Sequence, residues 1–324
     1  MIDNPYSGNT FFEFFYTLLI RLFEFISGNL PFVNLATDEI QMIVLAGVSA
    51  SSAMVGTFLV LRKMTMLANS LSHTILLGIV IAFLLTKNSV LPSANGYVEP
   101  INIFAMMFAS LIMGIVTTFL TEFLTKTVKL QEDASTGLVF TGLFALGIIL
   151  VTLLTRNAHI GTEVVMGNVD ALHLDDCKFI FIILGINTFL FLLFFKEFKI
   201  TTFDPGLSRA IGISTIFFNY LLMAQVSLTT IGAFRAVGVL MVLSFITGPP
   251  LIARLLTNHL KLMIAYSIII GVSASIIGVA ISRHFLSVHG MALSTSGLVV
   301  TTILILFVGI ALYSNFSKKI HLRT

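Results

Sequence analysis

Nine apolar windows, each about 20 residues long, recur along this chain and restrict its fold more than any other feature. A helix of that length crosses roughly 30 Å of hydrocarbon, and within lipid only helices and closed barrels satisfy every backbone hydrogen bond. The windows lie near residues 40–61, 65–86, 101–125, 135–155, 178–195, 214–233, 236–253, 262–282 and 294–314. The sequence therefore predicts an all-α, polytopic transmembrane bundle of about eight or nine spans.

Composition excludes several other classes of protein. Hydrophobic residues make up 57% of the 324 residues, charged residues only 10%, and the mean hydropathy is +1.03, so a soluble core of this size could not bury the apolar surface. The single cysteine, Cys177, allows no intramolecular disulfide, and no Cys-x-x-Cys or His-Glu-x-x-His spacing indicates a zinc centre. We expect neither an enzyme nor a nucleic-acid-binding protein.

The cations fall in alternate connections between the windows. Twelve of the eighteen Lys and Arg residues do so: Arg62, Lys63, Lys126, Lys129, Lys196, Lys199, Arg209, Arg254, Lys261, Lys318, Lys319 and Arg323. By the positive-inside rule these connections are cytoplasmic. The opposite face then carries acidic and imidazole groups that would attract cations, including His159, Glu163, Asp170, His173, Asp175 and His289. The alternative for each of these residues is an ordinary solvated loop.

The first 35 residues form an aromatic segment that is interrupted by charge. Glu13, Arg21 and Glu24 stand within this segment, and a spanning helix rarely tolerates three charges. We predict an amphipathic helix in the membrane interface, with an additional span as the alternative. The chain is thus divided into an interfacial segment at 1–35, a transmembrane domain at 36–316 and a basic cytoplasmic tail at 317–324.

The second window carries a stripe of polar side chains. On a helix over 65–86, Thr65, Asn69, Ser72 and His73 fall within roughly a 100° arc. Polar groups at membrane depth are costly unless they face a protein interior or a water-filled path. Asn69 and His73, four residues apart, could present an oxygen and an imidazole nitrogen to one metal ion. The alternative is that the stripe forms hydrogen bonds between helices.

Two further positions bear on packing. Arg235 stands between two apolar windows, either at the outer tip of a hairpin or inside a broken helix, and Gly238 and the Pro249–Pro250 pair favour irregular backbone nearby. The first window is rich in small residues between Gly47 and Gly56, which let a neighbouring helix approach closely. We interpret that window as a packing surface.

One cytoplasmic connection contains all the signals of a short helix. Asp204 suits the N-cap, Pro205 suits the first turn, and Gly212 suits a left-handed position at the C-terminal end. The face that nothing in the connection covers is formed by Leu207, Ala210 and Ile211. This face predicts docking onto a soluble partner, with a capped turn lying back on the membrane surface as the alternative.

Three motifs occur in order: Val60-Leu61-Arg62-Lys63-Met64 leading to Asn69-Ser70-Leu71-Ser72-His73; Phe203-Asp204-Pro205 leading to Ser208-Arg209-Ala210-Ile211-Gly212; and Arg235-Ala236-Val237-Gly238-Val239-Leu240-Met241 leading to Thr247-Gly248-Pro249-Pro250. With these motifs, residues from about 40 to 315 resemble the membrane permease subunits of bacterial ABC importers for manganese, zinc and iron. Within that family the chain is most similar to the shorter permease of chlamydial metal-uptake systems.

The resemblance implies a role for the polar stripe. The family's motif is usually Asp-Ala-Leu-Ser-His, whose Asp and His contribute to metal coordination near the outer gate, and the matching positions here are Asn69 and His73. Because the usual carboxylate is absent, either a second, different permease subunit supplies the charge or this subunit contributes only His73. The resemblance therefore favours a heterodimeric pore.

The resemblance also implies partners and a location. The residues matching the family's coupling helix, which sits in a groove of the ATPase subunit, are Asp204, Pro205, Leu207, Arg209, Ala210, Ile211 and Gly212. The chain has no glycine-rich phosphate-binding loop, so separate cytoplasmic ATPase subunits would hydrolyse ATP. An extracytoplasmic metal-binding protein would deliver the ion. The location implied is the bacterial inner membrane, in contact with its lipids, and no cofactor would be bound permanently.

A secondary metal transporter driven by an ion gradient is the main alternative function. Such proteins usually keep Asp, Glu or Lys side chains at the bilayer midplane as a relay. Apart from Arg235, no charge lies well inside a window, and Glu122 is close to a cytoplasmic end. The choice among manganese, zinc and iron stays open, since imidazole suits all three and an amide oxygen shifts the balance slightly toward harder ions.

Overall fold

The computed structural model describes residues 4–321 except 29–30, 32–33, 88–102 and 156–168. Within that part of the chain every regular element is a helix, which confirms the all-α prediction. The long helices are α2 (Thr37–Leu61), α3 (Thr65–Lys87), α4 (Ile103–Lys126), α5 (Glu132–Thr155), α7 (Leu174–Phe203), α9 (Thr215–Val237), α10 (Val239–Leu256), α11 (Leu260–His289) and α12 (Thr295–His321). The short helices are α1 (Phe11–Ile26), η2 (Val169–Ala171) and α8 (Pro205–Ala210).

Most of the long helices have the length and apolarity of membrane spans. Among the described residues, 7 helices meet both criteria: α2, α5, α7, α9, α10, α11 and α12. The remaining two, α3 and α4, occupy the windows predicted at 65–86 and 101–125. The multi-pass bundle predicted from the apolar windows is thus confirmed.

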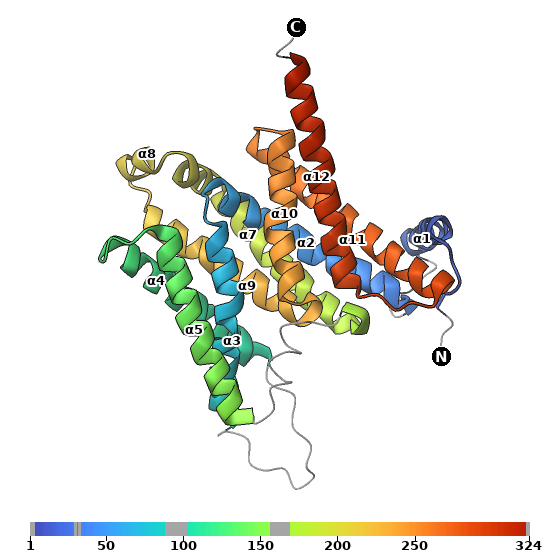
Figure 1. Ribbon diagram of the computed structural model, residues 1–324, viewed down its shortest axis with the longest axis horizontal. Helices are drawn as coiled ribbons and strands as arrows, with labels where there is room; N and C mark the ends of the chain where they lie inside the picture. Colours follow the sequence, from blue (N-terminus) through green and yellow to red (C-terminus); the bar gives the residue numbers. More distant parts are fainter. Residues whose placement is uncertain (1–3, 29–30, 32–33, 88–102, 156–168, 322–324) are drawn as a thin grey trace.

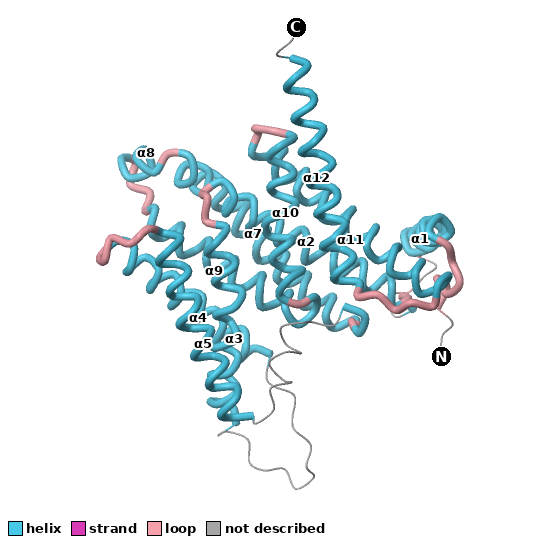
Figure 2. The backbone as a smooth tube through the Cα atoms, viewed as in Figure 1, coloured by secondary structure: helices cyan, strands magenta, loops and turns pink. Residues whose placement is uncertain are grey.

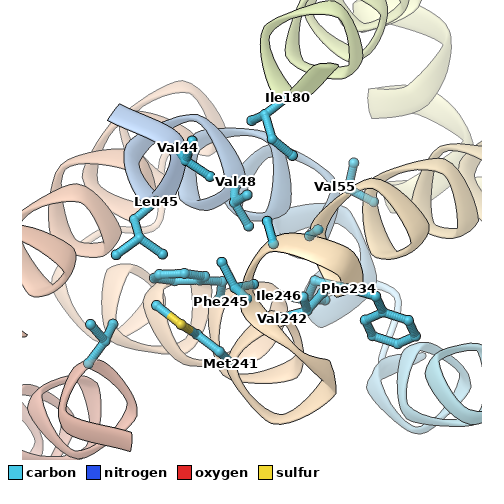
Figure 3. Close-up of a cluster of buried hydrophobic side chains, with 14 of the residues drawn as sticks. Val44, Leu45, Val48, Val55, Ile180, Phe234, Met241, Val242, Phe245 and Ile246 are labelled. Atoms are coloured by element: carbon cyan, nitrogen blue, oxygen red, sulfur yellow. The ribbon is translucent and has the colours of Figure 1, made fainter. Parts of the chain in front are cut away.

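Helix α2 lies at the centre of the bundle. It packs against α7, α9, α10 and α11, and 78% of its apolar window is buried inside the protein. Figure 3 shows Val48 of α2 facing Phe245 and Ile246 of α10. A Cβ atom at Gly56 would lie 1.9 Å from the backbone oxygen of Ile246, so only glycine permits this approach. The packing role predicted for the first window is therefore supported.

Helices α3, α4 and α5 form a second group beside this centre, as the tube in Figure 2 shows. Helix α3 packs against both α4 and α5, and α9 joins this group to α2. The polar stripe predicted on the second window thus lies on a helix with neighbours on two sides.

Several helices continue beyond the apolar windows. Helix α7 has 30 residues and bends at Phe194, where the backbone leaves helical geometry (φ −112°, ψ 21°). Lys196 and Lys199, expected in a loop, therefore lie in the last turns of α7, and His289, expected in an outer connection, ends α11. The windows mark the apolar part of each helix, whereas the backbone hydrogen bonds continue into the polar region beyond it.

The two ends of the bundle differ in the elements that they carry. In Figure 1 the α2–α3, α4–α5 and α10–α11 connections and α8 lie toward one end, and α1 and the α11–α12 connection lie toward the other. The first end is the one that the cation pattern predicts to be cytoplasmic, and we use the terms cytoplasmic and outer on that basis. Helix α1 has 16 residues, about 24 Å of helix, which is short for a span.

Candidate functional site

The polar stripe on α3 contains side chains in two different settings. Asn69, His73 and Thr65 are partly exposed, whereas Ser72 is buried and its hydroxyl donates to the backbone oxygen of Ala68 at 2.9 Å. Ser72 therefore satisfies its hydrogen-bonding group within its own helix. The part of the stripe that is available to a ligand is formed by Asn69 and His73, with Thr65 near the cytoplasmic end.

His73 packs against aromatic side chains of α5. The centre of its imidazole lies 5.1 Å from the ring centre of Phe140 and 5.3 Å from that of Phe144, and the two phenylalanine rings are stacked on each other. Sequence reasoning did not identify these two residues, although their spacing of four places them on one helix face. The aromatic contacts fix the plane of the imidazole without occupying its nitrogen atoms.

Other residues form a hydrogen bond between α3 and α4 in the part of the chain that the structure describes. Thr117 of α4 donates to the hydroxyl of Thr74 at 3.0 Å. Asn69 and His73 make no hydrogen bond to any residue that the structure describes. Within the described residues, no group of three or more His, Cys, Asp or Glu side chains could hold a metal ion. The described part of this chain therefore offers two donors on α3 and no complete ligand set.

Helix α8 has the local structure that its sequence predicts. The carboxylate of Asp204 accepts a hydrogen bond from the backbone N–H of Leu207 at 2.9 Å, Pro205 begins the helix, and Gly212 has φ +80°. The hydroxyl of Ser208, which is buried, donates to the backbone oxygen of Ile213 at 2.9 Å. These bonds hold a helix of 6 residues in a fixed shape at the cytoplasmic end.

The outward face of α8 is apolar and uncovered. Leu207 is 49% exposed and Ile211 is 52% exposed, and Ala210 beside them is exposed as well. The guanidinium of Arg209 donates to the backbone oxygen of Pro205 at 3.2 Å, so this hydrogen bond lies within α8 itself. The face predicted for a soluble partner is therefore open in this chain.

Arg62 connects the end of α2 to the helix that leads into α8. Its guanidinium donates to the hydroxyls of Thr201 and Thr202 in the last turn of α7, at 2.9 and 3.0 Å, and to the amide oxygen of Asn219 in α9 at 3.3 Å. Burial lowers the pKa of Arg62 to about 10. Two hydrogen bonds thus join the residue that follows α2 to the last turn of α7, which leads into α8, and the third joins it to α9.

The outer end contains a cavity of about 310 Å³ beside buried ion pairs. Arg283 of α11 forms a bidentate pair with Asp38 of α2, with N–O distances of 2.5 and 2.6 Å from one nitrogen. Asp170, also at this cavity, accepts hydrogen bonds from Thr295 at 2.6 Å and Gln41 at 3.3 Å. Asp170 therefore holds α12 and α2 together at the outer end.

The remaining outer residues of the sequence-based prediction are only partly described. His173 is exposed at the N-cap of α7, where its backbone N–H donates to Asp176 at 3.0 Å. His159 and Glu163 lie outside the described residues. The structure therefore brings together Asp170 and the Arg283–Asp38 pair, but it does not join His173 to them.

The backbone is irregular where α9 meets α10. Gly238 stands between the two helices with φ +79°, a conformation that L side chains rarely adopt. Arg235 lies in the last turn of α9, two residues before Val237 ends the helix. The irregular backbone predicted near Arg235 is thus found at Gly238, whereas Pro249 and Pro250 lie inside α10.

Comparisons with known proteins identify similar chains over nearly the whole length. The ABC 3 transport family matches residues 38–314. A probable metal transport system membrane protein of Chlamydia muridarum is 42% identical over 310 residues, which cover 94% of this chain and 93% of that one. The manganese transport system membrane protein MntD of Bacillus subtilis is 37% identical over 248 residues, or 72% of this chain and 79% of that one. Among solved structures, PsaBC from Streptococcus pneumoniae in complex with Fab has a TM-score of 0.71 and 24% identity, covering 89% of this chain and 95% of that chain.

Proposed function

The chain belongs to the ABC 3 transport family, and from that premise we infer that it is the membrane-spanning permease subunit of an importer for a divalent transition metal. The family match includes the stripe on α3, all of α8 and the break at Gly238. The observation that carries the proposal is α8, because a capped helix with an uncovered apolar face at the cytoplasmic end is a docking element for a soluble subunit. The hydrogen bonds of Arg62 tie the last turn of α7, which leads into α8, to the residue that follows the central helix.

Asn69 and His73 are this subunit's contribution to the metal path in our proposal. Two observations support the assignment: both side chains are partly exposed, and neither is used in a hydrogen bond to a described residue. An imidazole nitrogen and an amide oxygen suit manganese, zinc or iron. The relative in Bacillus subtilis is named for manganese, which makes Mn²⁺ the first ion to test. A second, different permease subunit would supply the carboxylate that Asn69 replaces.

The energy for transport comes from outside this chain in the proposed mechanism. Separate ATPase subunits bind the exposed face of α8, and their closure on ATP moves α8 and, through Arg62, the cytoplasmic end of α2. The metal ion is delivered at the outer mouth by an extracytoplasmic binding protein. The subunit then alternates between outward-open and inward-open states in the bacterial cytoplasmic membrane and carries out no covalent chemistry.

Vesicle uptake of Mn²⁺ by the reconstituted complex tests the metal path. We expect His73→Ala to abolish ATP-dependent uptake while thermal stability and ATPase association stay near the wild-type values, because a path residue is only partly packed. If His73 instead joined helices, its loss would destabilise the bundle by ~0.5–2 kcal/mol and leave residual uptake. His259→Ala is the matched control, since His259 is exposed at the N-cap of α11.

Two further arms make this experiment decisive. Asn69→Asp restores the family's usual carboxylate, and we expect metal binding that is equal or tighter, with turnover that is equal or lower, because a more strongly held ion leaves more slowly. An ionophore arm separates the two modes of energy supply: uptake that ignores ATP and collapses with the ion gradient would indicate a secondary transporter. Wild-type uptake by His73→Ala would end the assignment of the path.

A further inference from the structure

A second cavity lies at the cytoplasmic end, and neither Asn69 nor His73 is among the residues that line it. Its volume is about 350 Å³, and it lies where α2, α4 and α7 end and where α8 and α9 begin. The charged groups in its wall are three cations and one carboxylate, namely Arg62, Lys63, Lys126 and Glu122. The cavity therefore carries an excess of positive charge.

The carboxylate is already paired. Lys126 lies 3.0 Å from one oxygen of Glu122, and the hydroxyl of Tyr220 donates to the other oxygen at 2.9 Å. Arg62 and Lys63 form no ion pair with any carboxylate in the described part of the chain. Two positive charges in the cavity are thus without a counter-charge from the residues that the structure describes.

The side chain of Arg62 is surrounded by neutral groups and has no anionic partner among the described residues. Its three hydrogen-bond partners are neutral, and a guanidinium has five N–H groups, so two donors remain. The lowered pKa of about 10 has burial as its cause. Because a buried charge without a partner is costly, an anion in the cavity would stabilise this arrangement.

Lys63 is held in a strained backbone conformation beside Arg62. Its φ is +60°, in the left-handed region that favours glycine. The surrounding bonds are those of a helix C-terminus that usually ends in glycine, with Met64 donating to the oxygen of Leu59 at 2.9 Å. A lysine at this position introduces a charge at the cavity at the cost of backbone strain, which points to a role for its ammonium group.

We propose that this cavity binds the phosphate headgroup of an anionic phospholipid of the cytoplasmic leaflet. The depth is suitable, since Leu61 and Lys126 are the last residues of their spans and Thr215 is the first residue of α9. Ile216 also lines the cavity and is 54% exposed, so an apolar surface for an acyl chain begins at the rim. Basic pockets between transmembrane helices on the cytoplasmic side are suited to such headgroups.

Retention of phosphatidylglycerol by the purified complex in phosphatidylcholine nanodiscs, read by native mass spectrometry, tests the proposal. We expect Lys63→Gln and Lys126→Gln each to lower the affinity about fivefold and Glu122→Gln to raise it about fivefold, because each changes the charge of the cavity by one. Lys261→Gln is the control, since Lys261 is exposed at the same end but lies outside the cavity. All four variants are checked for unchanged thermal unfolding in phosphatidylcholine alone.

Two arms identify the source of the anion. Inorganic phosphate at matched concentration should displace little phosphatidylglycerol, because it lacks the acyl chain; complete displacement would contradict a lipid site. If Lys63→Gln retained lipid normally but released the ATPase subunit, the cavity would hold an acidic side chain of that subunit and the lipid proposal would fail. Equal lipid retention in Lys126→Gln and Glu122→Gln would overturn it as well.

Discussion

The two ends of α2 differ in what their partly buried arginines contact. At the outer end Arg283 pairs with Asp38, and Arg21 of α1 pairs with Glu39. At the cytoplasmic end Arg62 meets only hydroxyls and an amide. At the outer end the chain itself therefore supplies the carboxylates that neutralise these two arginines. The cytoplasmic end leaves positive charge to be met from outside, and this is the end where the ATPase subunits are proposed to bind.

The outer pairs also fasten the N-terminal segment. The hydroxyl of Tyr6, which is fully buried, donates to Glu39 at 2.9 Å, and the side chain of Asn4 donates to Asp38 at 2.8 Å. Burial, together with the neighbouring charge of Glu39, raises the pKa of Tyr6. The N-terminal segment thus completes the hydrogen bonding of the first turn of α2.

The largest effect should come from breaking the outer pair. We expect Asp38→Ala to lower the free energy of unfolding by about 3–5 kcal/mol, because it leaves the guanidinium of Arg283, which is only 16% exposed, without a counter-charge. Chemical denaturation in detergent micelles measures the change. The matched control is Asp175→Ala, whose ion pair with Lys178 is exposed on both sides and should contribute about 1 kcal/mol or less. Equal losses in the two variants would contradict the comparison.

The difference between the two ends could not be predicted from the sequence. Asp38 and Arg283 are 245 residues apart, and only the packing of α11 on α2 brings them together. The features that local chemistry determines were predictable: the apolar windows gave the helices, and Asp204, Pro205 and Gly212 gave α8. The polar stripe on α3 was likewise only partly predictable. Helical periodicity placed His73 beside Asn69, but the contact of His73 with Phe140 depends on how α5 packs against α3.

The next prediction concerns the face that the cytoplasmic end offers to a partner. We expect Leu207→Asp to lower the affinity for the ATPase subunit by more than about a hundredfold, because it buries an unpaired charge at the contact. Insertion and thermal unfolding of the permease should stay unchanged, since Leu207 is half exposed in this chain. Leu207→Met, which keeps the surface apolar, is the control. Normal co-purification of the ATPase subunit with the Asp variant would exclude this face as the contact.

A third variant tests how tightly the middle of α2, between its two ends, is packed against α10. We expect Gly56→Ala to destabilise the protein by about 1–3 kcal/mol, because the new methyl group would meet the backbone of Ile246 at 1.9 Å. Gly185→Ala in α7 is the control, since nothing lies within 4 Å of its Cβ, and it should be neutral or stabilising by up to about 1 kcal/mol. A neutral Gly56→Ala would mean that α2 and α10 separate easily.

The smallest expected change is also the sharpest test of the comparison. We expect Arg62→Met to alter the free energy of unfolding by less than about 1 kcal/mol, because the loss of three hydrogen bonds to neutral groups is offset by removal of a desolvated charge. The same substitution at Arg283 removes the partner of buried Asp38 and should cost several times more. Parallel chemical denaturation curves of the two variants in detergent micelles make the measurement. If Arg62→Met proved as destabilising as Arg283→Met, the charge of Arg62 would stabilise the fold as that of Arg283 does. It would then not be available for a partner.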